Sequence, residues 1–175
     1  MIPETLVRLA NLGRPRRPAG AREPEVEPVL PDPGGAARQL DDLISRPVAE
    51  ADLPALRHVQ QLAFDAAEAL LAGELPDCAA INAIAGGSTA HIELAATNTG
   101  GLCERLVWHD SSTAAELTRH LVEDLAALDA ARLRCCARAE CDLVFYDTTR
   151  SRTRRWHAED PCGWRERQHH HRANS

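Results

Sequence analysis

Residues 136–162 read CARAECDLVFYDTTRSRTRRWHAEDPC, and this stretch decides the C-terminal part of the fold. Cys136 and Cys141 enclose four residues, fifteen residues separate Cys141 from His157, and four more separate His157 from Cys162. Zinc takes four soft or borderline ligands in a tetrahedron, and proteins supply them as short-spaced pairs. The spacing therefore predicts one structural Zn²⁺ ion held by Cys136, Cys141, His157 and Cys162.

Two alternatives to this ligand set remain open. The first is that the cysteines are reduced and bind no metal. The second is that Cys135 is the ligand instead of Cys136; neighbouring side chains cannot easily point at one ion, and we favour Cys136. Cys78 and Cys103 stand apart from this cluster among apolar neighbours, so we expect both to be packed thiols.

The segment between the two ligand pairs indicates how they meet. Residues 143–146 suit a strand, residues 147–149 suit a turn, and residues 153–156 can return as a second strand. Such a hairpin would place one ligand pair against the other. A short helix is expected to begin at Gly163 and to carry Arg165, Arg167 and Arg172.

Residues 1–131 predict a mostly helical body. Apolar residues at helical spacing indicate long helices over residues 51–72 and from Ser112 to about Leu133. Shorter helices are expected over residues 36–46 and 78–85.

The same region contains signals for strands and a loop. Residues 90–96 and 102–108 flank the sequence TNTGG, which predicts a β-hairpin. The early run LVRLAN, residues 6–11, is expected to form an edge strand. Residues 13–35 are rich in proline and glycine and are expected to form an extended loop. The fold class is therefore α+β, with a small zinc-bound hairpin-and-helix module at the C-terminus.

Charge is divided between the two parts of the chain, which contains no lysine. Residues 1–131 have a net charge of −10 and residues 132–175 a net charge of +4, giving −6 in total. An acidic body with a basic end leaves that end able to meet phosphate groups. The arginines expected to contact DNA lie on or beside the zinc hairpin: Arg150, Arg152, Arg154, Arg155, Arg165 and Arg167. On the expected second strand, Arg150, Arg152 and Arg154 would share one face.

Several function classes are disfavoured by the sequence. No apolar run approaches the ~20 residues of a membrane span, and the N-terminus lacks a secretory pattern, so we expect a cytoplasmic protein without membrane contact. No GxGxxG after a strand, Walker A loop, GxSxG or HExxH occurs. Four protein ligands also close a zinc site, whereas a catalytic zinc keeps one position open. We therefore expect no enzyme activity.

The C-terminal stretch resembles the CGNR zinc finger family. That family runs C-x4-C, then an aromatic strand with a D-T/S-x-R turn, then RRWC-x4-CGNR. The matching positions are Cys136, Cys141, Phe145, Asp147, Thr148, Arg150, Arg154, Arg155, Trp156, Cys162 and Gly163. Two positions depart from the pattern: His157 replaces the usual cysteine, and Trp164 replaces the asparagine, while Arg165 is retained.

Residues 1–131 are similar in length and order to the ABATE domain that accompanies this zinc finger. The resemblance implies two domains, 1–131 and 132–175, in a bacterial stress-induced transcription regulator that binds DNA. Its N-terminal domain would sense an effector or oligomerise, for example as a homodimer. The alternative is a zinc-stabilised module that binds a protein partner without direct DNA contact. Trp164 would pack on the hairpin or stack on a base, and packing is favoured.

Overall fold

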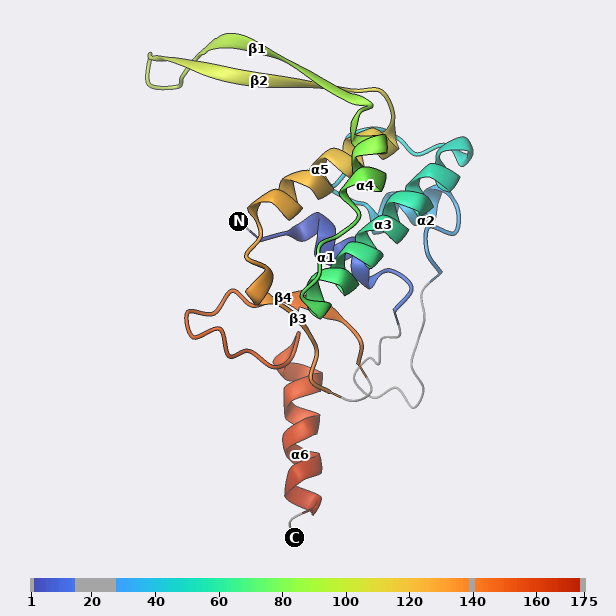
Figure 1. Cartoon of the computed structure of the whole chain (residues 1–175), viewed down its shortest axis with the longest axis vertical. Coiled ribbons are helices and arrows are strands. Elements are labelled where there is room, and N and C mark those ends of the chain that lie inside the picture. Colours follow the sequence, from blue (N-terminus) through green and yellow to red (C-terminus); the bar gives the residue numbers. More distant parts are fainter. Residues whose placement is uncertain (1, 15–27, 139–140, 174–175) are drawn as a thin grey trace.

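The computed structural model describes residues 2–14, 28–138 and 141–173 and combines helices with two small sheets (Figure 1). The helices of the body are α1 (Glu4–Asn11), α2 (Pro33–Gln39), α3 (Leu53–Ala72), α4 (Cys78–Ala85) and α5 (Thr113–Ala127). Among the described residues, no helix combines the length and the apolar character needed to cross a membrane.

Two antiparallel strand pairs complete the fold. The first consists of β1 (Ser88–Ala96) and β2 (Leu102–Asp110), which confirms the predicted hairpin. The second consists of β3 (Leu133–Cys135) and β4 (Val144–Tyr146). The C-terminal helix α6 (Trp164–Ala173) follows and extends away from the body (Figure 1). The expected α+β class, with a hairpin-and-helix module at the C-terminus, is confirmed.

The core of the body lies between α1, α3 and α5. The fully buried side chains at its centre are leucines and a valine: Leu6, Leu9, Leu56, Val59, Leu117 and Leu121. Ser112 begins α5 as predicted, because its hydroxyl accepts a hydrogen bond from the backbone N–H of Ala115 at 3.1 Å. Asp77 likewise begins α4 by accepting from the N–H groups of Ala79 and Ala80.

The prediction of an edge strand at residues 6–11 is wrong, because this segment forms α1. Leu6, Leu9 and Ala10 share one buried face, which is the spacing of a helix and not of a strand. The buried carboxylate of Asp124 fixes the start of the helix by accepting a hydrogen bond from the N–H of Leu6 at 2.9 Å. Six residues with mixed apolar spacing gave too little signal to decide between the two structures.

Three other boundaries differ from the sequence prediction. The helix expected over residues 36–46 ends at Gln39, and α5 ends at Ala127 because Leu128 has an extended backbone. Leu133 instead begins β3. Of the expected loop, residues 15–27 lie outside the described residues, and residues 33–35 belong to α2.

The two isolated cysteines are not packed as expected. Cys78 lies at the start of α4 and Cys103 lies on β2, and both are exposed. Cys103 is exposed because the β1–β2 hairpin extends from the body and leaves both of its faces largely open to solvent (Figure 1).

The β3–β4 pair is attached directly to the body. Leu133 and Val144 are buried in the same core as α1 and α3. The side-chain amide of Asn11 donates to the carbonyl of Val144 and accepts from its N–H, each at 2.8 Å. Arg14 adds a bond to the carbonyl of Asp142 at 2.8 Å. These contacts fix the β3–β4 pair on the body, and the chain continues from β4 to His157 and Cys162.

Candidate metal centre and its basic surface

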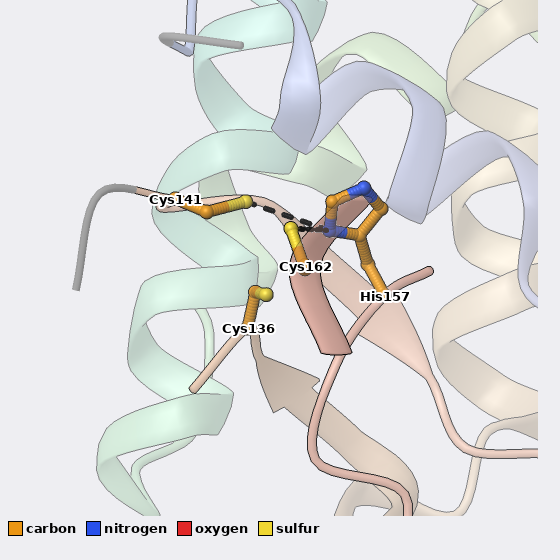
Figure 2. Close-up of side chains that lie close together, drawn as sticks. All are labelled: Cys136, Cys141, His157 and Cys162. Atoms are coloured by element: carbon orange, nitrogen blue, oxygen red, sulfur yellow. Dashed lines mark hydrogen bonds between the residues drawn. The ribbon is translucent and has the colours of Figure 1, made fainter. Parts of the chain in front are cut away.

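Four side chains predicted as zinc ligands gather around one space: Cys136, Cys141, His157 and Cys162 (Figure 2). Their ligand atoms all lie within 4.8 Å of one another. The Nδ1 atom of His157 lies 3.4 Å from Sγ of Cys141 and 3.7 Å from Sγ of Cys162. A tetrahedral zinc ion with bonds of ~2.3 Å to sulfur and ~2.0 Å to nitrogen requires a sulfur–nitrogen separation of about 3.5 Å. The separations involving His157 already match this geometry.

The first ligand pair is placed by the end of the β3–β4 sheet. The N–H of Cys136 donates to the carbonyl of Leu143 at 2.9 Å, which extends the ladder by one step beyond Cys135. Successive residues of an extended chain point to opposite sides. Cys135 is accordingly exposed while Cys136 is buried, which favours Cys136 over its neighbour as the ligand. A hydrogen bond from the N–H of Cys141 to the carbonyl of Arg138 forms a turn between the two cysteines of this pair.

The second ligand pair lies on the segment that leads into α6. The strand expected over residues 153–156 does not form, and the partner of β4 is β3. Arg152 has a positive φ of 55°, which interrupts an extended chain. A single backbone bond, from Ala137 N–H to the carbonyl of Arg155 at 2.8 Å, brings the two ligand pairs together. The predicted row of Arg150, Arg152 and Arg154 on one strand face is therefore wrong.

A buried carboxylate organises the turn that replaces this strand. Asp147 has no exposed surface and accepts hydrogen bonds from Thr149, through N–H at 2.9 Å and the hydroxyl at 2.6 Å. It also accepts from the N–H of Arg154 at 2.9 Å, and Arg134 lies 3.8 Å away. The Thr149 hydroxyl bond, followed by the other donors, lowers the pKa of Asp147 against the opposing effect of burial. Asp147 therefore closes the loop that precedes His157.

The chemistry of the donor set fits a metal ion. Burial, together with the neighbouring Cys136 and Cys162, raises the pKa of the Cys141 thiol to about 12. Burial also raises the pKa of Cys162, while a hydrogen bond from Arg138 opposes this effect. Three buried thiols and one imidazole, with ligand atoms within 4.8 Å of one another, form the kind of donor set that Zn²⁺ takes. A bound Zn²⁺ stabilises the thiolate forms and so accounts for the arrangement.

Three residues outside the ligand set support the site. Arg138 is buried and bonds to Cys162, so its positive charge offsets part of the negative charge of three thiolates. Trp156 packs against the buried cysteines. A Cβ at Gly163 would lie 3.1 Å from the Trp156 ring and 2.6 Å from the Glu159 carboxylate, so a larger residue there would displace the Glu159 side chain and press on the ring. Arg138 was not predicted, because an arginine between two cysteines carries no signal of burial.

Two of the six arginines proposed to contact DNA, Arg152 and Arg154, have partners within the chain. The Arg154 guanidinium donates to the carbonyls of Trp156 and His157 and lies 5.2 Å from the Phe145 ring. It therefore braces the segment that carries a metal ligand. Arg152 pairs with Asp129 at 3.2 Å.

Of the other four arginines, Arg150, Arg155 and Arg167 are exposed and Arg165 is half-buried. Arg167 pairs with Glu159 and lies 6.0 Å from the Trp156 ring, and the Arg155 guanidinium lies 5.3 Å from the same ring. Among the described residues, Arg150, Arg155 and Arg165 form no ion pair. Trp164 is 52% exposed, so the favoured expectation that it packs on the hairpin is not met. Trp156 packs on the site instead.

Comparison with known proteins agrees with the geometry at this end of the chain. Residues 132–175 match the family model of the CGNR zinc finger. This segment is thus a zinc-binding module, with one structural zinc ion held by three cysteines and one histidine. No curated protein matches the chain. Because the family match covers residues 132–175, the ABATE resemblance of residues 1–131 stays a prediction.

Proposed function

We propose that the protein is a non-catalytic, DNA-binding transcription regulator whose zinc module supplies the DNA contact. The observation that carries this proposal is the exposed Trp164 beside Arg165, at the start of α6 and two residues after the ligand Cys162. Zinc bound at Cys162 fixes the position of this helix end. An aromatic ring and guanidinium groups held rigidly in solvent are suited to meet bases and phosphates.

The charge of the module supports the same proposal. Arg155 and Arg165 have no carboxylate partner among the described residues, so their charge is available to a phosphate backbone. The pair of Arg167 with Glu159 is exposed on both sides, and such a pair exchanges partners at little cost. Arg150 is exposed on the turn after β4. The strongly acidic body would be repelled by DNA and would face away from it.

The form of α6 provides a third support. Its sequence, WRERQHHHRA, has polar residues on every side, and Figure 1 shows the helix extending away from the body. A short helix that is polar all round gains little from packing. Its ten residues span about 15 Å. An α-helix, with a diameter of about 10–12 Å including side chains, fits the major groove of B-DNA, which is about 12 Å wide.

The test measures binding of the zinc-loaded protein to a fluorescent random-sequence duplex at about 50 mM and 200 mM salt. Binding that weakens with salt is expected, because phosphate contacts release counterions. The variant Arg155→Ala/Arg165→Ala should bind more weakly, and its salt slope should fall by about 1.8 if both side chains contact phosphate. The matched control is Arg38→Ala/Arg105→Ala, which removes the same charge from exposed positions of the body.

The outcomes separate two functions. Equal losses in both double variants would mean that general charge drives binding, which contradicts a zinc-organised surface. Absence of duplex binding by the zinc-loaded protein would overturn the proposal and favour a module that binds a protein partner. Trp164→Ala gives an independent readout, because its removal should weaken binding without changing the salt slope.

A further inference from the structure

The β1–β2 hairpin has one apolar face that nothing in the described chain covers. The register pairs Ala90 with Trp108, Ile92 with Leu106, Leu94 with Glu104 and Ala96 with Leu102. Because side chains alternate along a strand, these eight residues point to the same side. Its five large apolar residues are Ile92, Leu94, Leu102, Leu106 and Trp108, with exposed fractions between 41% and 73%. Glu104 is the single charged residue among these eight; Asp110, at the base of the same face, pairs with Arg119.

The opposite face of the hairpin is polar and largely paired. His91 and His109 stack with their ring centroids 4.9 Å apart, and their Nδ1 and Nε2 atoms lie 2.7 Å from each other. Glu93 forms an ion pair with Arg105 of the facing strand. This face is suited to water. The hairpin is therefore amphipathic, although it lies outside the core of the body (Figure 1).

An uncovered face of this kind is unfavourable in an isolated chain. Two-stranded hairpins are marginally stable alone, and strands of nine residues with open edges invite pairing with another chain. The five exposed side chains present on the order of 500 Å² of apolar surface, which is at the upper end for a monomer's largest patch. Burial of that area at ~25 cal/mol per Å² would be a substantial gain.

We propose that a second copy of this chain covers the apolar face, with the two hairpins packed face to face as two layers of a sandwich. The area supports this occupant: with the two alanines at its rim, the patch presents about 600 Å² per copy, and the total of about 1,200 Å² reaches the lower end of the range for specific interfaces. A second copy brings an equal apolar area, so one contact removes both from water.

The position of Glu104 is compatible with the same occupant. Glu104 lies one same-face pair towards the tip from the central pair Ile92–Leu106, so a two-fold axis through that central pair places the two glutamates on opposite sides of the axis. It would place Glu104 of each copy towards the base of the other hairpin.

The test is the molar mass of the full zinc-loaded chain, measured by sedimentation equilibrium over a range of concentrations. The chain has a mass of 19.1 kDa, and the wild type should approach twice that value. The variant Ile92→Glu/Leu106→Glu charges the central pair of the apolar face and should weaken dimerisation at least ~100-fold. The matched control is Ala95→Glu/Cys103→Glu, a facing pair on the polar side, which should remain dimeric.

Hydrogen exchange keeps the proposal testable if a variant fails to fold. In the wild type, protection of the amides of β1 and β2 should rise with protein concentration, while protection of the amides of α3 and α5 should not change. A wild-type protein that is monomeric at ~100 μM, with exchange independent of concentration, would overturn the proposal in favour of a different partner. Dimerisation that survives in Ile92→Glu/Leu106→Glu would show that the copies meet elsewhere, and would equally overturn it.

Discussion

Asp147, whose side chain is fully buried, accepts a hydrogen bond at 2.9 Å from the backbone N–H of Arg154, seven residues further along the chain. The bond closes a loop between the strand that is anchored on the body and the segment that carries His157. Arg154 then donates from its side chain to the carbonyls of Trp156 and His157. One carboxylate and one guanidinium thus fix the approach of a metal ligand over a segment without regular structure.

The substitution Asp147→Asn should weaken zinc binding. An amide offers one acceptor oxygen in place of two, and its NH₂ group would face either the donors of Thr149 or the N–H of Arg154. We expect zinc affinity to fall by about 10- to 100-fold, as for other residues that orient metal ligands. Chelator competition measures this change. Asp160→Asn is the control, since Asp160 is exposed beside the site, and an equal loss there would contradict the role of Asp147.

Cys135 and Cys136 should differ sharply when each is replaced by serine. Cys136 is buried in the ligand cluster, whereas Cys135 is exposed on the other side of the chain. Cys136→Ser should lower zinc affinity by more than ~100-fold, because it removes a ligand and not an outer partner. Cys135→Ser should bind one zinc ion per chain, as the wild type does. The zinc content of each variant after dialysis distinguishes the two cysteines. Loss of zinc from Cys135→Ser but not from Cys136→Ser would show that Cys135 is the ligand.

Replacing His157 by cysteine should preserve the site. His157 approaches Cys141 and Cys162 through Nδ1, an atom close to its backbone, so the Sγ of a cysteine occupies a comparable position. Both three-cysteine-one-histidine and four-cysteine sets bind zinc tetrahedrally. In the cobalt-substituted protein, His157→Cys should increase the thiolate-to-metal charge-transfer absorption by about a third. His157→Ala is the comparison, and if it kept full metal content, His157 would not be a ligand.

Removal of zinc should affect the C-terminal part of the chain unevenly. Val144 is held by Asn11 and is buried in the body core, so its amide should stay protected after chelation. Residues 147–163 depend on the metal and on few apolar contacts, so they should lose protection. Hydrogen exchange with and without chelator measures both segments. If the amides of Val144 and of α3 lost protection together with residues 147–163, the metal would stabilise the whole chain.

The metal ligands could be predicted from the sequence because their spacing alone carries the signal. The β1–β2 hairpin could be predicted for a similar reason, since TNTGG separates two strand-like runs of equal length. In both cases the deciding residues lie close together along the chain. Gly100 has the positive φ of 82° that such a turn requires.

The partner of β4 could not be predicted in this way. The turn-like residues 147–149 favour residues 153–156 as the partner, whereas no local signal links residues 133–135 to Val144–Tyr146. The choice depends on Leu133, which is buried against the body when residues 133–135 pair with β4. Tertiary burial thus decided the pairing, which no local pattern reveals.

The roles of the arginines also could not be predicted from the sequence. Arg154 and Arg155 are neighbours with the same side chain, yet one is used internally and the other is exposed. The difference arises because the loop closed by Asp147 directs the carbonyls of residues 156 and 157 towards Arg154. Such convergence depends on the folded path of the chain and not on residue type.

The pairing of Asn11 with Val144 determines how the protein can be divided. The amide of Asn11 bonds to Val144 as a neighbouring strand would, with one donor and one acceptor. A fragment consisting of residues 132–175 would lose both bonds and expose Leu133 and Val144 to water. The zinc finger is therefore completed by a helix from the opposite end of the chain, and a peptide containing α1 is the natural complement for restoring an excised module.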